Sequence, residues 1–116
     1  MDRVEKAVSE LDGVVASMPD EQYGEYIVDA LELHIRKYEG EARRALELAL
    51  GVWLNGPDLK RCIWAKTLVV RLRLVEYLST LRKLREEVLE ADSRFPRYWL
   101  ELFDHSIRLL EEACNK

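Results

Sequence analysis

The chain has 116 residues, with 18 Lys and Arg against 22 Asp and Glu and a net charge of −4. This length fits one domain over residues 1–116, and 48% hydrophobic with 34% charged residues excludes a disordered chain and a membrane-spanning protein. Met1-Asp2-Arg3 does not resemble the start of a signal peptide, and Cys62 and Cys114 lack the spacing of a disulfide framework or a zinc site. We therefore expect a cytoplasmic protein.

Apolar residues at helical spacing predict two helices in the first half of the chain, over residues 2–17 and 19–54. Pro19 marks the start of the second helix, because proline is favoured in the first turn. The apolar stripe of this segment keeps its phase past Gly40, which predicts one long helix that bends there. The run 55–58, Asn-Gly-Pro-Asp, predicts the turn that follows.

The second half predicts a helix over 58–91 and a final helix over 96–114. The first of these carries apolar residues at alternating steps of three and four, the spacing of a seam that packs against another helix. The residues we assign to this packing or dimer seam are Ile63, Val70, Leu74, Tyr77, Leu81 and Leu84. Because a second apolar stripe lies beside the seam, we expect this helix to be central in a bundle or to pair with a second chain.

These elements predict an all-α fold, a bundle of about four helices joined by short turns and packed mostly antiparallel. The surplus apolar surface of the third helix predicts that the bundle forms a homo-oligomer, a dimer above all, or a complex with another protein.

Charge is divided unevenly along the chain. Residues 1–34 have a balance of −7 and residues 60–85 have a balance of +7. The basic residues of the second segment are Lys60, Arg61, Lys66, Arg71, Arg73, Arg82, Lys83 and Arg85. They form ion pairs with the acidic first part inside one bundle, or they form a stripe that binds an acidic protein or nucleic acid.

Arg71 and Arg73 distinguish these two interpretations, since they interrupt a stretch that is otherwise apolar all round the helix. Two arginines are costly to desolvate there unless they are paired. We expect them to pair with carboxylates of the second helix, such as Glu25, Asp29 and Glu32, or to reach a binding surface.

The sequence offers no pattern typical of catalysis. His34 and His105 lack the spacing of a metal pair, and Cys62, although it follows Lys60 and Arg61, has no partner that could act as a catalytic base. There is no glycine-rich phosphate loop and no nucleophile motif. We therefore expect a protein that is not an enzyme and needs neither a metal nor a cofactor.

Three stretches together resemble the helical domain of archaeal GINS subunits. Residues 18–26 resemble its proline, acidic and aromatic opening, 68–75 its Arg-containing apolar stretch, and 96–114 its later helix. The resemblance covers roughly residues 10–115. It implies a non-catalytic scaffold that joins a replicative helicase to other proteins of DNA replication.

The sequence thus favours a helical interaction or scaffold protein, with a GINS-like replication component as its specific form. The alternative is a nucleic-acid-associated helical subunit, such as the small subunit of a CRISPR effector, that uses residues 60–85. A pI near 5.3 favours the first, because nucleic-acid-binding domains are commonly basic overall. Few thermolabile amides (Gln22, Asn55 and Asn115) among many charges indicate a thermophilic, archaeal source.

Overall fold

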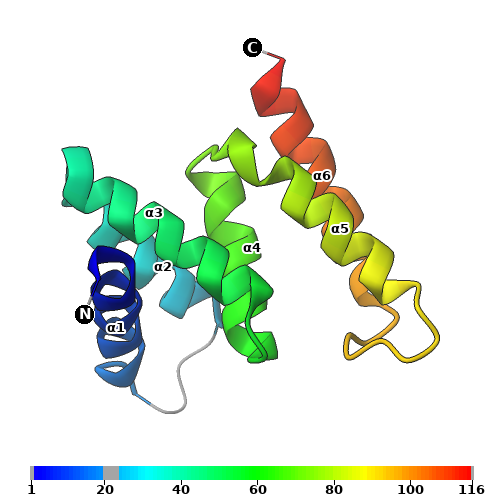
Figure 1. Ribbon diagram of the computed structural model, residues 1–116, viewed down its shortest axis with the longest axis horizontal. Helices are drawn as coiled ribbons and strands as arrows, with labels where there is room; N and C mark the ends of the chain where they lie inside the picture. The colour runs from blue at the N-terminus through cyan, green and yellow to red at the C-terminus, as the bar shows by residue number, and fades with distance from the viewer. Residues whose placement is uncertain (1, 20–23, 116) are drawn as a thin grey trace. The chain divides into compact units, whose positions relative to one another are not determined.

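The computed structural model describes residues 2–19 and 24–115, and in these ranges the chain is all-helical, with six α-helices, one short 3-10 helix and no strand (Figure 1). The elements are α1 (Arg3–Ala16), α2 (Gly24–Arg36), α3 (Gly40–Asn55), α4 (Leu59–Arg71), η1 (Val75–Tyr77), α5 (Leu78–Val88) and α6 (Trp99–Cys114). The prediction of an all-α fold is confirmed. Contacts divide the chain into two units, Met1–Leu68 and Val69–Lys116, and α4 continues from the first into the second. No described helix combines the length and the apolar character needed to cross a membrane.

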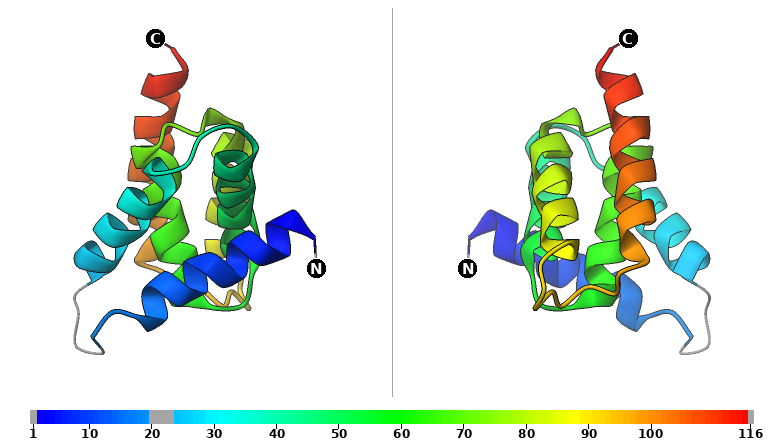
Figure 2. Two further views of the ribbon diagram at one scale, coloured as in Figure 1. Left: turned by 90° about the vertical axis from the view of Figure 1, so that its left-hand side faces the viewer. Right: turned by 90° about the vertical axis from the view of Figure 1, so that its right-hand side faces the viewer.

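The first unit is built on α1, which packs against α3 and α2 and crosses α3 at a steep angle (Figure 2). The Asp2 carboxylate caps α1 by accepting a hydrogen bond of 2.8 Å from the Glu5 N–H. The buried apolar side chains described in this unit are Ala7, Leu11, Val28, Leu31, Ile35, Ala45, Leu46, Ala49, Leu50, Trp53, Leu54, Cys62, Trp64, Ala65 and Leu68. The Cys62 thiol lies inside this core, 3.4 Å from the Leu54 carbonyl oxygen, whereas Cys114 is exposed at the end of α6.

The prediction of one helix over 19–54 is wrong, because α2 ends at Arg36 and α3 begins at Gly40. Its predicted start also falls partly on residues 20–23, which lie outside the described ranges. Gly40 has a φ of +60°, a left-handed conformation that a right-handed helix cannot continue through and that glycine adopts without strain. The three residues between the helices amount to nearly one helical turn, so the apolar stripe keeps its phase across the break.

The prediction of one helix over 58–91 is also wrong. The Asp58 carboxylate caps α4 by accepting from the Arg61 N–H at 3.0 Å, but α4 ends at Arg71. There the Leu74 N–H donates to the Val69 carbonyl at 2.9 Å and the Arg73 N–H donates to the Val70 carbonyl at 3.1 Å. This pair of bonds is the Schellman motif, which requires a left-handed residue, and Arg73 has a φ of 54°. The predicted four-helix count fails at these two breaks.

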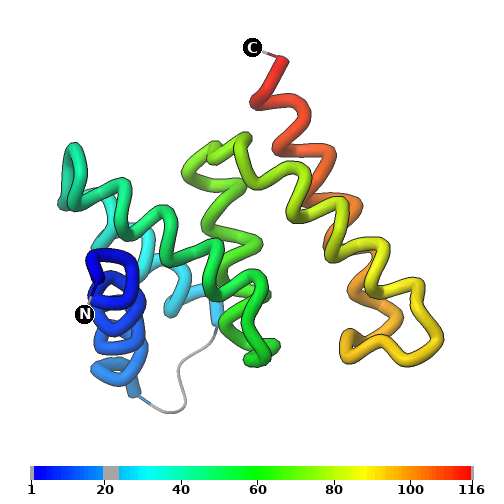
Figure 3. Tube along the Cα trace, in the orientation of Figure 1, coloured from blue at the N-terminus to red at the C-terminus, as the bar shows by residue number. Residues whose placement is uncertain are grey.

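The second unit contains a helical hairpin of α5 and α6, which lie side by side and are joined by residues 89–98 (Figure 3). The buried side chains that hold it together are Val69, Tyr77, Leu81, Leu84, Val88, Phe95, Trp99, Phe103, Ile107 and Leu110. At the loop end the rings of Phe95, Trp99 and Phe103 form a cluster with centroids 5.3 to 6.3 Å apart. Aromatic rings at these distances contribute more than the area they bury, so the cluster fixes where α6 begins.

Candidate interaction surfaces

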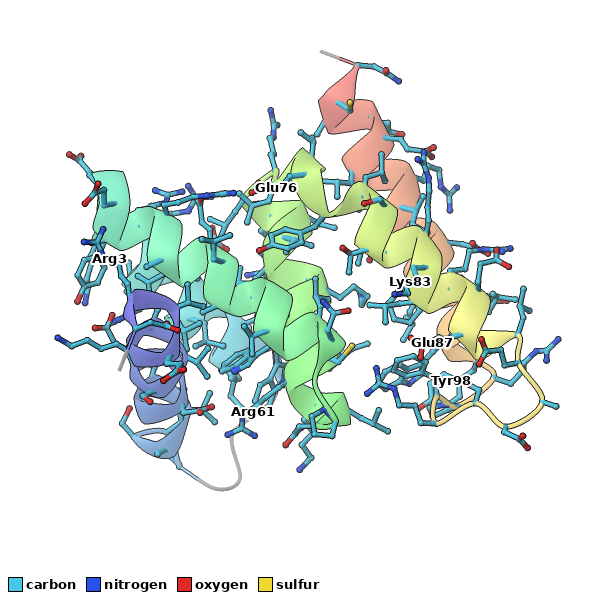
Figure 4. All side chains as sticks on the ribbon, viewed as in Figure 1. Arg3, Arg61, Glu76, Lys83, Glu87 and Tyr98 are labelled. Carbon is cyan, nitrogen blue, oxygen red and sulfur yellow. The ribbon has the colours of Figure 1, made fainter. Side chains whose placement is uncertain are left out.

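Arg61, which is labelled in Figure 4, lies near the start of α4 and contacts three groups of the first unit. Its guanidinium lies 2.8 Å from the Asp12 carboxylate of α1, 2.8 Å from the Asp58 carboxylate, and 5.7 Å from the centre of the Trp53 ring. The hydrogen bond to Asp12 raises the pKa of Arg61 above its usual value. Arg61 therefore links α1 to α4.

Two more basic residues are held inside the second unit. Arg82 of α5 lies 2.7 Å from Glu111 of α6, and Arg85 contacts Asp104 of α6 as well as Glu86. The ion pair with Asp104 raises the pKa of Arg85. The pairs with Glu111 and Asp104 join α5 to α6, as ordinary ion pairs between neighbouring helices do.

The other basic residues have different surroundings. Lys66 is buried, with only 7% of its surface exposed, and burial lowers its pKa, an effect that the neighbouring Cys62 thiol opposes. Lys60 and Lys83 are exposed, and Lys83 is labelled on α5 in Figure 4. The eight basic residues thus differ in their surroundings and belong to both units.

Arg71 and Arg73 are both exposed. Among residues 69–115 Arg73 makes no ion pair. Of the carboxylates expected to pair with these arginines, Glu32 lies 2.8 Å from Arg36 on its own helix.

The six residues of the predicted seam are distributed over α4, η1, α5 and the loop between them, so they do not form one continuous seam. Tyr77, Leu81 and Leu84 are buried. Ile63, Val70 and Leu74 are half-buried. Of the residues predicted to form a packing or dimer seam, those of η1 and α5 lie in the core, whereas the three before Val75 are partly exposed.

An apolar groove of about 300 Å³ lies on the first unit, between α1 and α3. Val4 and Val8 of α1 and Val52 of α3 line it, and Asp2 and Glu5 supply two carboxylates at its rim. Val52 is 49% exposed, and Leu48, one turn earlier on α3, is 39% exposed. We call the five lining residues the α1/α3 groove. The sequence signal was available, because Leu48 and Val52 are four apart on a face that the predicted core stripe does not use.

A smaller cleft, of about 190 Å³, lies on the second unit. Val70, Leu109 and Ala113 form its apolar part, and Arg73 and Glu112 supply one charge of each sign. Leu109 is 38% exposed. We call these five residues the α6 face; no sequence pattern indicated them, since they meet only after the chain turns at Arg73.

Neither surface offers paired groups for acid–base chemistry. A hollow of about 360 Å³ is lined by Val15, Ile27 and Trp64 among others, and Lys60 is the one ionisable side chain among the described residues that line it. His34 of α2 lies 2.8 Å from Glu10 of α1, and its ring is tilted against that of Tyr38 with centroids 5.3 Å apart, so it joins α1 to α2. Within 2–19 and 24–115, no three His, Cys, Asp or Glu residues come together as metal ligands would.

Comparison with known proteins gives no relative for this fold: no family model, no curated protein and no solved structure matches the chain.

Proposed function

We propose that the chain is a non-catalytic helical interaction protein that binds a protein partner through the α1/α3 groove. The exposure of Val52 and Leu48 beside a groove lined by Val4 and Val8 carries this proposal. Single exposed apolar residues are ordinary, but an apolar groove between two helices with charged residues at its rim is typical of a site for an amphipathic helix.

The rim of the groove selects the kind of helix that binds. Asp2 and Glu5 are both exposed acidic residues. A partner helix that places an apolar side chain against Val52 and Lys or Arg beside it would match both features. We therefore propose a basic amphipathic helix as the partner.

The resemblance to GINS subunits supports one setting for such a protein, a scaffold in archaeal DNA replication. The nucleic-acid alternative has less support. Three guanidinium groups of the basic segment, those of Arg61, Arg82 and Arg85, already contact carboxylates, and phosphate binding would have to compete with these pairs.

The test uses two synthetic helical peptides with the same leucine stripe, one flanked by lysines and one by glutamates, with binding followed by fluorescence anisotropy. We expect the lysine peptide to bind and the glutamate peptide to bind much more weakly. Val52→Asp should weaken binding at least about tenfold, since burial of a valine contributes about 1.5 kcal/mol. Leu33→Asp is the matched control, because Leu33 is an exposed residue of α2 outside the groove.

Equal binding of both peptides, or binding that Val52→Asp leaves intact, would remove the groove as the site. Binding of duplex or single-stranded DNA that weakens steeply with salt would favour the nucleic-acid alternative instead.

A further inference from the structure

We propose that the chain also associates with a second copy of itself, through the α6 face. This surface is separate from the α1/α3 groove and its occupant is different. The argument rests on three features of the face: its charges, its apolar centre and the conformation of Arg73.

The charges of the face are self-complementary. Arg73 and Glu112 line the same cleft, yet within residues 69–115 neither of them forms an ion pair. A two-fold axis that passes close to Leu109 would bring Arg73 of each copy to Glu112 of the other. Symmetric dimers use one patch twice in this way, so a patch with one charge of each sign is satisfied twice by its own copy.

The apolar centre suits the same arrangement. Leu109 is 38% exposed, and Val70 and Ala113 are half-buried beside it. On association the two Leu109 side chains would cover each other and the cleft of about 190 Å³ beside them. A partner of one charge sign would satisfy only one rim residue and place a like charge against the other, which favours a second copy over an acidic or a basic protein.

The conformation of Arg73 is the third feature. The Schellman bonds to Val69 and Val70 hold its backbone at a φ of 54°, where glycine is the favoured residue. Glycine would suit this backbone conformation better than arginine. An arginine held there under strain indicates that its side chain has a role. Arg73 lines the cleft from this fixed corner of the backbone.

The α6 face is accessible to a second chain, whereas part of the predicted packing or dimer seam is not. Leu81 and Leu84 are buried between α5 and α6 and are not available to a second chain. Leu109 lies on α6, on a different side of the helix from its buried residues.

Sedimentation equilibrium over micromolar to millimolar chain concentration tests the proposal. We expect a monomer–dimer equilibrium for the natural sequence. Arg73→Glu and Glu112→Arg should each raise the dissociation constant at least about tenfold, because each places like charges together twice in the dimer. An equimolar mixture of the two variants should regain dimers, since every contact between them joins opposite charges, and the double variant should regain them as well.

Leu109→Asp should also give a monomer, and Leu89→Asp is its matched control because Leu89 is 39% exposed. Circular dichroism of each variant verifies the fold, and the rescue by mixing does not depend on the stability of any single variant. A natural chain that is monomeric throughout, single reversals without effect, or a mixture that stays monomeric would each overturn the proposal. Val52→Asp should leave the dimer unchanged, so that failure of the groove and failure of the dimer are distinguishable.

Discussion

Replacement of Arg73 by glycine should not destabilise the protein, although a glycine at an ordinary helical position does. Arg73 is the left-handed residue of the motif that ends α4, with a φ of 54°. The two bonds of this motif, from Leu74 to Val69 and from Arg73 to Val70, are both made by backbone atoms and remain in the variant.

The magnitude follows from two opposing effects. The left-handed conformation costs a residue with a Cβ atom about 1–2 kcal/mol of stability, and glycine adopts it without this cost. Glycine in turn loses about 0.5–1 kcal/mol more than other residues because its unfolded chain is freer. We therefore expect Arg73→Gly to raise the free energy of unfolding by up to about 1.5 kcal/mol, or up to about 6 °C in Tm.

Lys83→Gly is the matched control. Lys83 is exposed in the middle of α5, where glycine costs about 1 kcal/mol. Both variants bear the entropic cost of glycine, so the difference between them reports the strain at Arg73. Arg73→Ala keeps the Cβ atom and should be less stable than Arg73→Gly.

Urea unfolding followed by far-UV circular dichroism measures all three variants. An Arg73→Gly protein that is as destabilised as Lys83→Gly would refute the left-handed conformation of Arg73, and with it the position of the break between α4 and η1.

Two further predictions concern pH. Burial lowers the pKa of Lys66, so between its folded pKa and 10.5 the unfolded chain binds more protons and the free energy of unfolding rises with pH. Lys66→Met should raise the urea midpoint at neutral pH and remove this rise. A pH profile of stability that Lys66→Met leaves unchanged would contradict the burial of Lys66. The hydrogen bond from the backbone N–H of Arg61 lowers the pKa of Asp58, so the contribution of Asp58 to stability is present above about pH 3.8 and is lost as pH falls through the folded pKa. Asp58→Ala should cost about 1 kcal/mol of stability at neutral pH, whereas Asp58→Asn should keep the helix cap and lose the acid dependence. Thermal melts of both variants at pH 3 and pH 7 measure these effects.

Composition and periodicity were sufficient to predict an all-helical chain, and the turn before Asp58 was predictable because its residues have known conformational preferences. The two breaks were not predictable in the same way. The loop before Gly40 is nearly one helical turn long and preserves the apolar phase. The break at Arg73 contains neither glycine nor proline, and its left-handed residue is one that ordinarily favours helices.

The candidate surfaces were harder to predict than the fold. Val4 and Val8 fall on the same sequence stripe as Leu11, and only the packing of α1 across α3 shows that Leu11 is buried while the two valines line a groove. For residues 60–85, the sequence indicated two alternatives, ion pairs within the protein and a surface that binds an acidic partner. It could not indicate that the Asp12 carboxylate would lie 2.8 Å from Arg61, since 49 residues separate them.

The two cysteines differ in exposure, so their rates of reaction with a thiol reagent report the opening of the core. Cys114 is exposed and should react with a thiol reagent at once, whereas Cys62 is fully buried beside the Leu54 carbonyl. The slow phase of a two-phase labelling reaction would therefore measure how often the core around Cys62 opens, without any added fluorophore or substitution. Since Asp12, Trp53 and Arg61 surround the start of α4 near this thiol, their variants can be ranked by that rate alone.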